Sequence, residues 1–318
     1  MTTSGTSALP SAATVGYLGP EGTFTEQAMH READLAALTS VPFDSMPDVL
    51  FAVEEGQVDL GVVPIENAIE GTVNATIDTL AFDVDVLIQR ELVQRVQHNL
   101  LTVPGAPLMG ITKVVSIPVA TAQCRTWLRE HLPGVAHGAA NSTAEAARAV
   151  AEGGDPAVGA IANVRAAEVY GLDVAAADIE DHPENRTRFV VVGRDSVPAP
   201  TGRDKTSIVV YQQADRPGSL LAILSEFAAR SINLTLLLSR PTKTSLGDYC
   251  FLLELDGHVA DAQVADCLHQ LKATQGDVKF LGSYPAAAPP DPVERSTATT
   301  PATDADTWLD DLRTRIRP

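Results

Sequence analysis

The chain has 318 residues, of which 23 are Lys or Arg and 41 are Asp or Glu, so its formal net charge at pH 7 is −18. This length is typical of two domains, and a hydrophobic content of 45% is enough to fill their cores. The acidic balance argues against nucleic acid and against an anionic membrane surface as partners, because both carry negative charge. The three cysteines are far apart, and no Cys or His spacing is typical of a disulfide framework or a metal site.

Residues 1–13 are small and polar, which predicts a disordered segment. They contain neither a basic residue nor an apolar run, so they do not resemble a signal peptide. No stretch of the sequence has the length and apolarity of a membrane span. We therefore expect a cytoplasmic protein.

Residues 14–194 alternate short apolar runs with helical patterns, which predicts an α/β domain with covered, partly parallel sheets. The predicted strands cover 14–19, 58–65, 111–117, 157–162 and 188–194. The predicted helices cover 23–33, 46–56, 72–81, 119–132, 142–153 and 163–171. Two of them begin with a capping box, in which a hydroxyl caps free backbone N–H groups: Thr23 with Glu26, and Ser142 with Glu145.

A linker rich in Pro and Gly is predicted at 195–204. After it, residues 205–284 have the order β-α-β-β-α-β, which is typical of a ferredoxin-like domain. The predicted elements are strands at 206–212, 232–240, 248–257 and 278–284, and helices at 216–231 and 261–274. Residues 285–318 begin with an Ala/Pro/Thr-rich run that predicts disorder, and 306–316 have the pattern of a short amphipathic helix.

Three arginines, Arg186, Arg188 and Arg194, fall within nine positions of an otherwise acidic chain. Small polar residues also occur at several strand-to-helix junctions, namely 19–24, 64–73, 116–124 and 141–145. In open α/β sheets ligands bind at the carboxyl ends of the strands, where helix N-termini favour anions. We therefore expect one anionic ligand in a cleft, held in part by the forked donors of an arginine.

The same residues also have structural explanations. Arg186 can pair with Glu184 or Asp181, and Glu66 fits an exposed loop as well as it fits a site. In a regular strand Thr187 and Arg188 would point to opposite faces of the sheet. Both can serve one site only if the chain bends there, or if the site wraps round the end of the strand.

Four segments resemble the prephenate dehydratase family: GYLGPEGTFTEQA (16–28), VPIENAIEGTVNATIDTL (63–80), STAEAA (142–147) and NRTRFVVVG (185–193). The resemblance extends from residue 14 to 284. It implies a catalytic region at 14–194 with two α/β lobes and a cleft between them, like a type II periplasmic binding protein. Residues 205–284 resemble the ferredoxin-like ACT regulatory domain that follows this region in the family.

The resemblance implies that prephenate, a dianion, is converted to phenylpyruvate with loss of CO2 and water. Formation of the aromatic ring drives this reaction, so neither a metal nor an organic cofactor is expected. The threonine of the Thr-Arg-Phe triplet is essential in the family, and Thr187 would donate a hydrogen bond to the departing ring hydroxyl. Arg188 would hold a carboxylate and Phe189 would wall the pocket. The family's polar pocket positions correspond to Asn67, Ser116, Gln123, Ser142 and Thr143.

The ACT resemblance implies control by phenylalanine or another aromatic amino acid. The effector-binding positions would be Gly218, Ser219, Leu220, Asn233, Leu234, Ser239 and Arg240. Two positions depart from the family pattern: Leu238 replaces a glutamate beside Ser239, and Ile117 replaces a histidine between Ser116 and Pro118. Because ACT domains commonly pair edge to edge, the resemblance also implies a homodimer or homotetramer.

Two alternatives stay open at this level. Arogenate dehydratase carries out the same chemistry on the transaminated substrate, and the two substrates differ in one keto or amino group. A two-lobed ligand sensor without catalysis would also use an arginine and helix N-termini to bind an anion. The absence of an export signal and the intact Thr187-Arg188-Phe189 triplet favour the enzyme.

Overall fold

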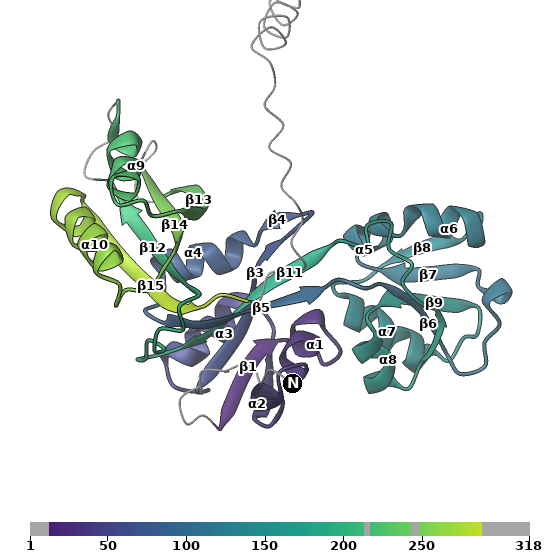
Figure 1. The fold of residues 1–318 in the computed structure, drawn as a ribbon. Coiled ribbons are helices and arrows are strands. Elements are labelled where there is room, and N and C mark those ends of the chain that lie inside the picture. The colour runs from purple at the N-terminus through teal and green to yellow at the C-terminus, as the bar shows by residue number, and fades with distance from the viewer. Residues whose placement is uncertain (1–12, 213–216, 243–247, 288–318) are drawn as a thin grey trace, which may run out of the picture. The chain divides into compact units, whose positions relative to one another are not determined.

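The computed structural model describes residues 13–212, 217–242 and 248–287 (Figure 1). Most of both predicted tails, and the helix expected at 306–316, lie outside these residues. Within the described ranges, no helix combines the length and the apolarity needed to cross a bilayer. The chain forms three sheets, two within residues 14–193 and one after them.

The first sheet has the strand order β2-β1-β3-β11-β5, and β4 pairs with the outer part of β3. Its strands are β1 (Thr14–Leu18), β2 (Thr39–Phe43), β3 (Leu60–Asn67), β4 (Gly71–Thr72), β5 (Leu87–Arg95) and β11 (Arg186–Gly193). Strands β1, β2 and β3 are parallel, whereas β11 runs antiparallel to both of its neighbours. The apolar run 189–192 is buried because β11 lies inside the sheet.

Four helices flank this sheet and complete the first lobe: α1 (Phe24–His30), α2 (Ala33–Ala36), α3 (Met46–Glu54) and α4 (Asn74–Phe82). The predicted cap at Thr23 is confirmed, since its Oγ1 accepts from the Glu26 N–H at 3.3 Å. Ser45 caps α3 in the same way through the Asp48 N–H. These caps fix where each helix begins after its strand.

The second sheet has the order β10-β6-β9-β7-β8 and belongs to a second lobe. Its elements are β6 (Asn99–Thr102), β7 (Lys113–Ser116), α5 (Pro118–Gln123), α6 (Arg125–His131), β8 (Ala136–Ala139), α7 (Thr143–Gly153), β9 (Val158–Ala162), α8 (Val164–Tyr170) and β10 (Asp173–Ala176). The chain passes between the lobes twice, from β5 to β6 and from β10 to β11 (Figure 1).

The single helix predicted at 119–132 is wrong, because the structure divides it at Cys124 into α5 and α6. Asp181, which precedes β11, supplies the hydrogen bonds at this break. Its N–H donates to Gln123 O at 2.6 Å and its carboxylate accepts from the Thr126 N–H at 3.1 Å. A segment distant in sequence therefore satisfies backbone groups that a continuous helix would satisfy internally.

The third sheet, with the order β13-β14-β12-β15, confirms the predicted β-α-β-β-α-β domain. Its elements are β12 (Asp204–Tyr211), α9 (Ser219–Ala229), β13 (Leu234–Pro241), β14 (Tyr249–Asp256), α10 (Ala262–Thr274) and β15 (Asp277–Pro285). We call this part, residues 204–287, the C-terminal domain. One face of its sheet packs on α9 and α10 through residues such as Ile208, Phe227 and Leu253.

The other face of the third sheet shares an apolar core with the first lobe. Ile77, Leu80 and Ile88 of the lobe belong to one buried cluster with Leu252 and Leu281 of the C-terminal domain. Gly282 permits the close approach of β15 to β5, since a Cβ there would lie 2.5 Å from the carbonyl oxygen of Ile88. The two regions therefore pack directly on one another.

An interdomain charge cluster, formed by Arg188, Lys205, Glu66, Glu91 and Glu254, adds to this contact. Arg188 Nε donates to Glu66 at 3.1 Å, and its Nη1 donates to Glu91 at 3.1 Å and to Glu254. Lys205 Nζ lies 3.1 Å from both Glu91 and Glu254. The side chains of Glu91 and Glu254 are each only 3% exposed, so the charges are satisfied by one another rather than by water.

The cluster sets the ionisation of Glu254. Burial alone would raise the pKa of this carboxyl, but Arg188, Lys205 and the hydroxyl of Thr235 lower the pKa to about 2. Burial alone would likewise lower the pKa of Arg188, and its acidic neighbours, Glu254 foremost, raise it above its ordinary value. Both groups are therefore charged at neutral pH.

We expect Gly282→Ala to destabilise the protein, because the added methyl meets the Ile88 backbone and because Gly282 has a φ of +139°. Overpacking of this kind typically costs about 1–3 kcal/mol. Gly202→Ala is the matched control, since Gly202 has a φ of +83° but no atom within 4 Å of the added Cβ. Thermal unfolding should show the larger loss for Gly282→Ala, and equal losses would contradict the close packing of β15 on β5.

Stability should also depend on the charge of Glu254. Its folded pKa of about 2 lies below the ordinary value of 4.5, so its contribution is complete above pH 4.5 and is lost as the pH falls towards 2. Glu254→Gln should lower the free energy of unfolding at pH 7 by about 2–3 kcal/mol. Urea unfolding at several pH values should show the difference from the wild type narrowing below pH 4.5. A difference that is independent of pH would contradict this account.

Candidate active site

Thr187 lies at the start of β11, directly opposite Asn67 at the end of β3. The Asn67 amide is oriented by its own turn, because Oδ1 accepts from the N–H groups of Ile69 and Glu70 at 2.9 and 3.0 Å. Its Nδ2 therefore faces Thr187 and donates to Oγ1 at 2.9 Å. The Thr187 hydroxyl accepts this bond, and within the described part of the chain its own proton meets no acceptor. It is free to donate to a ligand.

Gln123, at the end of α5 in the second lobe, contacts the first lobe near Asn67. Its Nε2 donates to Glu70 Oε1 at 3.3 Å, next to the turn that holds Asn67. Its Oε1 lies 3.0 Å from His98 Nε2 and 3.4 Å from Asn185 Nδ2. The structure thus brings together three of the predicted residues, Thr187, Asn67 and Gln123, where the two lobes meet.

His98 and Asn185 were missed by the sequence analysis. They lie in the two segments that connect the lobes, and His98 also makes an edge-on contact with the ring of Phe24. His98 Nδ1 and Asn185 Oδ1 are buried, and neither has a hydrogen-bond partner among the described residues. Burial lowers the pKa of His98, although Gln123 and Glu180 act in the opposite direction. The imidazole is therefore neutral at pH 7. His98 Nδ1 and Asn185 Oδ1 are two buried acceptors close to Gln123.

Ser142 and Thr143 lie at the N-terminus of α7. The predicted capping box is present, since Ser142 Oγ accepts from the Glu145 N–H at 2.9 Å and Glu145 accepts from the Asn141 N–H at 3.1 Å. Ser142 lines a cavity of about 440 Å³ between the lobes, together with Gly19, Phe43 and Arg148. Arg148 forms no ion pair within the described ranges, and the acidic residues Asp44 and Glu145 line the same cavity.

Ser116 takes a different position from the other predicted pocket residues. Its side chain is fully buried, and its hydroxyl donates to Ile161 O at 2.7 Å within the second sheet. The hydroxyl proton is therefore used by the backbone of β9. The structure assigns Ser116 to the carboxyl end of β7 and does not bring it to Thr187.

Arg188 and Phe189, which follow Thr187 in the triplet, contact other parts of the structure. Phe189 is 1% exposed and belongs to the core of the first lobe with Tyr17 and Leu92. Arg188 lies in the interdomain charge cluster, where its guanidinium contacts three carboxylates of this chain. The register of β11 with β3 shifts between Arg188 and Phe189. The side chains of Thr187 and Arg188 nevertheless lie on opposite faces of the sheet.

The predicted effector residues lie in two segments of the C-terminal domain. Gly218 has a φ of +90° and precedes α9, which starts with Ser219 and Leu220. The other four residues lie at 233–240, where Asn233 Nδ2 donates to Asp256 at 2.7 Å and Leu234 and exposed Ser239 lie in β13. Arg240 contacts the catalytic region, since it donates to Asp78 at 2.8 Å and to Asn74 at 3.0 Å. Leu238, at the family's glutamate position, packs against the shared apolar core.

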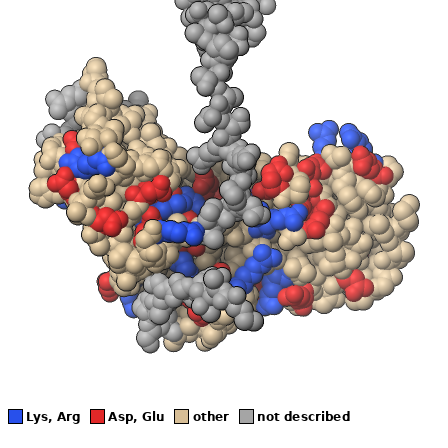
Figure 2. All heavy atoms as spheres, viewed as in Figure 1, with Lys and Arg blue, Asp and Glu red and all other residues tan. Residues whose placement is uncertain are grey.

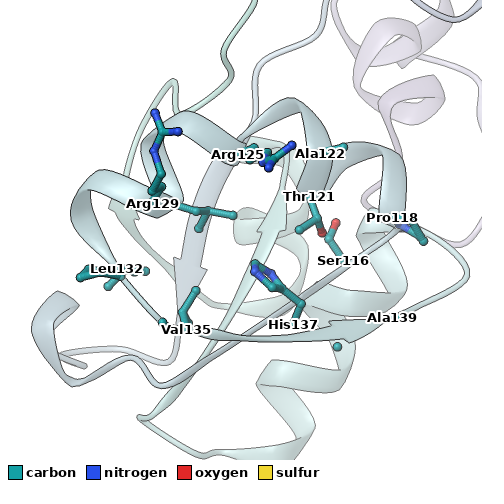
Figure 3. Close-up of a pocket in the computed structure, with 14 residues that line it drawn as sticks. Ser116, Pro118, Thr121, Ala122, Arg125, Arg129, Leu132, Val135, His137 and Ala139 are labelled. Carbon is teal, nitrogen blue, oxygen red and sulfur yellow. The ribbon is translucent and has the colours of Figure 1, made fainter.

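A second cavity of about 650 Å³ lies within the second lobe, between α5, α6 and strand β8 (Figure 3). Arg125 and Arg129 project from α6 on one side, and His137 projects from β8 on the other. Ser116 is the only predicted catalytic or substrate-binding residue that lines it. On the described part of the face in Figure 2, Lys and Arg lie interspersed with Asp and Glu.

The sequence pattern of the prephenate dehydratase family matches residues 15–197, and that of the ACT domain matches residues 206–273. A prephenate dehydratase of Mycolicibacterium gilvum is 41% identical over 315 residues, which cover 94% of this chain and 98% of that protein. A prephenate dehydratase of Mycobacterium leprae is 41% identical over 312 residues, with 95% of each chain covered.

Two solved structures are similar to this chain over most of its length. The prephenate dehydratase of Arthrobacter aurescens, in complex with L-Phe, is 40% identical with a TM-score of 0.81, covering 95% of this chain and all of that one. GqqA, described as a novel type of quorum-quenching acylase, is 28% identical with a TM-score of 0.77, covering 86% of this chain and 98% of that one. The family pattern matches more than half of the chain, and relatives match nearly all of it. The chain therefore belongs to the prephenate dehydratase family of hydro-lyases, with an ACT domain after its catalytic region.

Proposed function

We propose that this chain converts prephenate to phenylpyruvate, with Thr187 as the hydrogen-bond donor to the departing ring hydroxyl. The observation that carries the proposal is the direction of the Asn67–Thr187 hydrogen bond. Because Asn67 donates to Thr187 Oγ1, the threonine proton remains available for a substrate oxygen. Asn67 also holds this hydroxyl in place, and a fixed donor stabilises developing negative charge more effectively than a mobile one.

The reaction asks for only a few contributions from the protein. The bond from the ring to its carboxylate breaks, its electrons move through the ring, and the ring hydroxyl leaves from the opposite carbon. The products are CO2, water and the aromatic phenylpyruvate, and one proton is taken up by the leaving oxygen. A threonine hydroxyl is too weak an acid to give up its proton fully, so Thr187 supports the leaving oxygen by a hydrogen bond.

The substrate's two carboxylates require cations, and Arg188, which was expected to hold one of them, already has carboxylate partners. Arg188 already contacts Glu66, Glu91 and Glu254, so a substrate carboxylate would have to displace one of them. Arg148 lines the cavity between the lobes. Arg186 begins β11, and no ion pair occupies it in the described part of the chain. We assign the carboxylate-binding role to these two arginines, and the cavity with Ser142 to substrate binding.

The C-terminal domain is assigned to control by an aromatic amino acid, with L-phenylalanine first because the related Arthrobacter protein was solved with it. The carboxylate of the effector would meet backbone N–H groups at the start of α9, after Gly218. Strand β13 lies at the edge of its sheet, and Leu221, Leu237 and Tyr249 are exposed nearby in this domain. These features support edge-to-edge pairing of two copies as a homodimer or within a homotetramer.

Thr187→Ala should lower kcat by roughly 10²–10⁴-fold and change KM much less, because the lost donor acts mainly in the transition state. Thr187→Ser retains the hydroxyl and should keep more of the activity. The measurement is phenylpyruvate formation from prephenate, followed by ultraviolet absorbance. Turnover by the Ala variant close to that of the wild type would remove Thr187 from this role.

The same assay separates prephenate from arogenate as the substrate. We expect kcat/KM for prephenate to exceed that for arogenate, since the two assigned arginines, Arg148 and Arg186, favour the more negatively charged substrate. The product from arogenate is phenylalanine, which is detected directly by amino-acid analysis. A higher kcat/KM for arogenate would assign the chain to the alternative reaction.

L-Phenylalanine should change the initial rate several-fold, and Gly218→Val should abolish this response while leaving basal turnover nearly unchanged. The φ of +90° at Gly218 is one that valine rarely adopts. Gly105→Val is a matched control, because Gly105 has a φ of +76° in the second lobe and no atom within 4 Å of the added Cβ. An unaltered response in Gly218→Val, or an equal loss in both variants, would place the effector elsewhere.

A further inference from the structure

We propose that Glu254 of the C-terminal domain is a positioning residue for Thr187 and acts through the guanidinium of Arg188. The inference deepens the proposed function and rests on it, because Thr187 is the donor assigned there. Glu254 never touches the substrate in this account. It fixes the strand that carries the donor.

Two side-chain pairs hold the ends of β3 and β11 together from opposite faces. On one face Asn67 donates to Thr187 at 2.9 Å. On the other face Arg188 donates to Glu66 at 3.1 Å. Glu66 directly precedes Asn67, and Arg188 directly follows Thr187, so each pair is covalently joined to the other. A shift of the Glu66–Arg188 pair therefore moves the donor and the amide that orients it.

The pairing of β11 with β3 changes register next to the donor. Thr187 and Arg188 pair with Asn67 and Glu66, and the register shifts before Phe189 pairs with Pro64. A bulge of this kind leaves one residue of β3, Ile65, unpaired and bends that strand locally. On its other side β11 pairs with β5 without a break from Arg186 to Val191. The side-chain contacts of Asn67 and Arg188 therefore add to the ladder in setting where Thr187 stands.

Glu254 is the best-fixed partner of Arg188 on the side of the C-terminal domain. It accepts hydrogen bonds from Tyr284 at 3.1 Å and from Thr235 at 2.6 Å, and Lys205 lies 3.1 Å away. Its side chain is 3% exposed, whereas that of Glu66 is 39% exposed. Buried charge pairs with additional hydrogen bonds have little freedom to move. Arg188 is thus anchored to the C-terminal domain by a buried carboxylate that has three further partners.

Thr235 connects this anchor to the predicted effector segment, because it lies in β13 between Leu234 and Ser239. Its hydroxyl donates to the Glu254 oxygen that also faces Lys205. Direct contacts therefore connect Thr235 in β13, through Glu254, to Arg188, which follows Thr187 in β11. Movement of β13 on effector binding would reach Thr187 by this route.

The test compares Glu254→Gln with Tyr211→Phe in steady-state kinetics with prephenate. The Gln side chain keeps the shape of Glu254 but removes its charge. Tyr211→Phe removes another contact between the C-terminal domain and the first lobe, the 2.6 Å bond from Tyr211 to Ala81 O, without touching β11. We expect Glu254→Gln to lower kcat by roughly 10–100-fold with less than a threefold change in KM. Tyr211→Phe should retain kcat within about twofold.

A double-mutant cycle shows whether Glu254 acts through Arg188. Arg188→Gln combined with Glu254→Gln should lower kcat no further than Arg188→Gln alone, since the two residues act as one unit. Additive losses would overturn the route through Arg188. A kcat for Glu254→Gln within about twofold of the wild type, or equal losses in Glu254→Gln and Tyr211→Phe, would overturn the positioning role.

Hydrogen–deuterium exchange measures how well the backbone amides of β11 are protected, independently of turnover. The amides of residues 187–189 should exchange faster in Glu254→Gln than in the wild type, and no faster in Tyr211→Phe. If Glu254→Gln fails to fold, Thr235→Val provides the milder change, since it removes one hydrogen bond to Glu254 from an exposed residue. Wild-type protein that does not turn over prephenate would refute the proposed function, while unchanged exchange at 187–189 in both variants would refute the positioning role.

Discussion

The side chains of β11 alternate between two faces of the first sheet, and most of the site's geometry follows from this alternation. Thr187 is placed where the lobes meet, beside Asn67, and Arg188 is placed where the catalytic region meets the C-terminal domain. Because one residue step separates them, neither can shift without the other. The strand therefore joins the proposed reaction site to the C-terminal domain through two adjacent residues.

The contact between the domains combines two kinds of interaction. The apolar core that includes Ile77, Leu80 and Leu252 removes surface from water and is not directional. The interdomain charge cluster has two cations and three carboxylates, and its geometry is directional. Replacing a buried ion pair with apolar groups is often neutral for stability, so the cluster is better explained by a role in fixing one arrangement than by added stability. Positioning of Thr187 is such a role.

The sequence predicted the parts of the fold whose signals are local. The capping boxes at Thr23 and Ser142 and the order of the C-terminal domain all follow from patterns of a few residues. Strand β5 was missed because its buried residues include Gln89, Arg90 and Glu91, which hide the alternation of a strand. The break at Cys124 was missed because its hydrogen bonds come from Asp181, far along the chain.

The site was predictable to a similar extent. The Thr187–Asn67 pair lies on motif residues, and Gln123 lies beside the turn that holds Asn67. Arg188 shows the limit of motif reasoning, because its position in the triplet does not reveal that Glu254 from a second domain would bind it. His98 had no local signal, since it is a single histidine in a connecting segment. Its importance appears only when two lobes bring it to Gln123.

The central claim is that prephenate binds where the lobes meet, with its ring hydroxyl at Thr187. A crystal structure of the Thr187→Ala variant with prephenate tests this most directly, because the variant should bind the substrate without consuming it. The account predicts the ring hydroxyl within about 2.6–3.2 Å of the position that a threonine Oγ1 would occupy. The substrate carboxylates should approach Arg148 or Arg186. Prephenate bound instead in the cavity of Arg125, Arg129 and His137, with the space beside Asn67 empty, would contradict it.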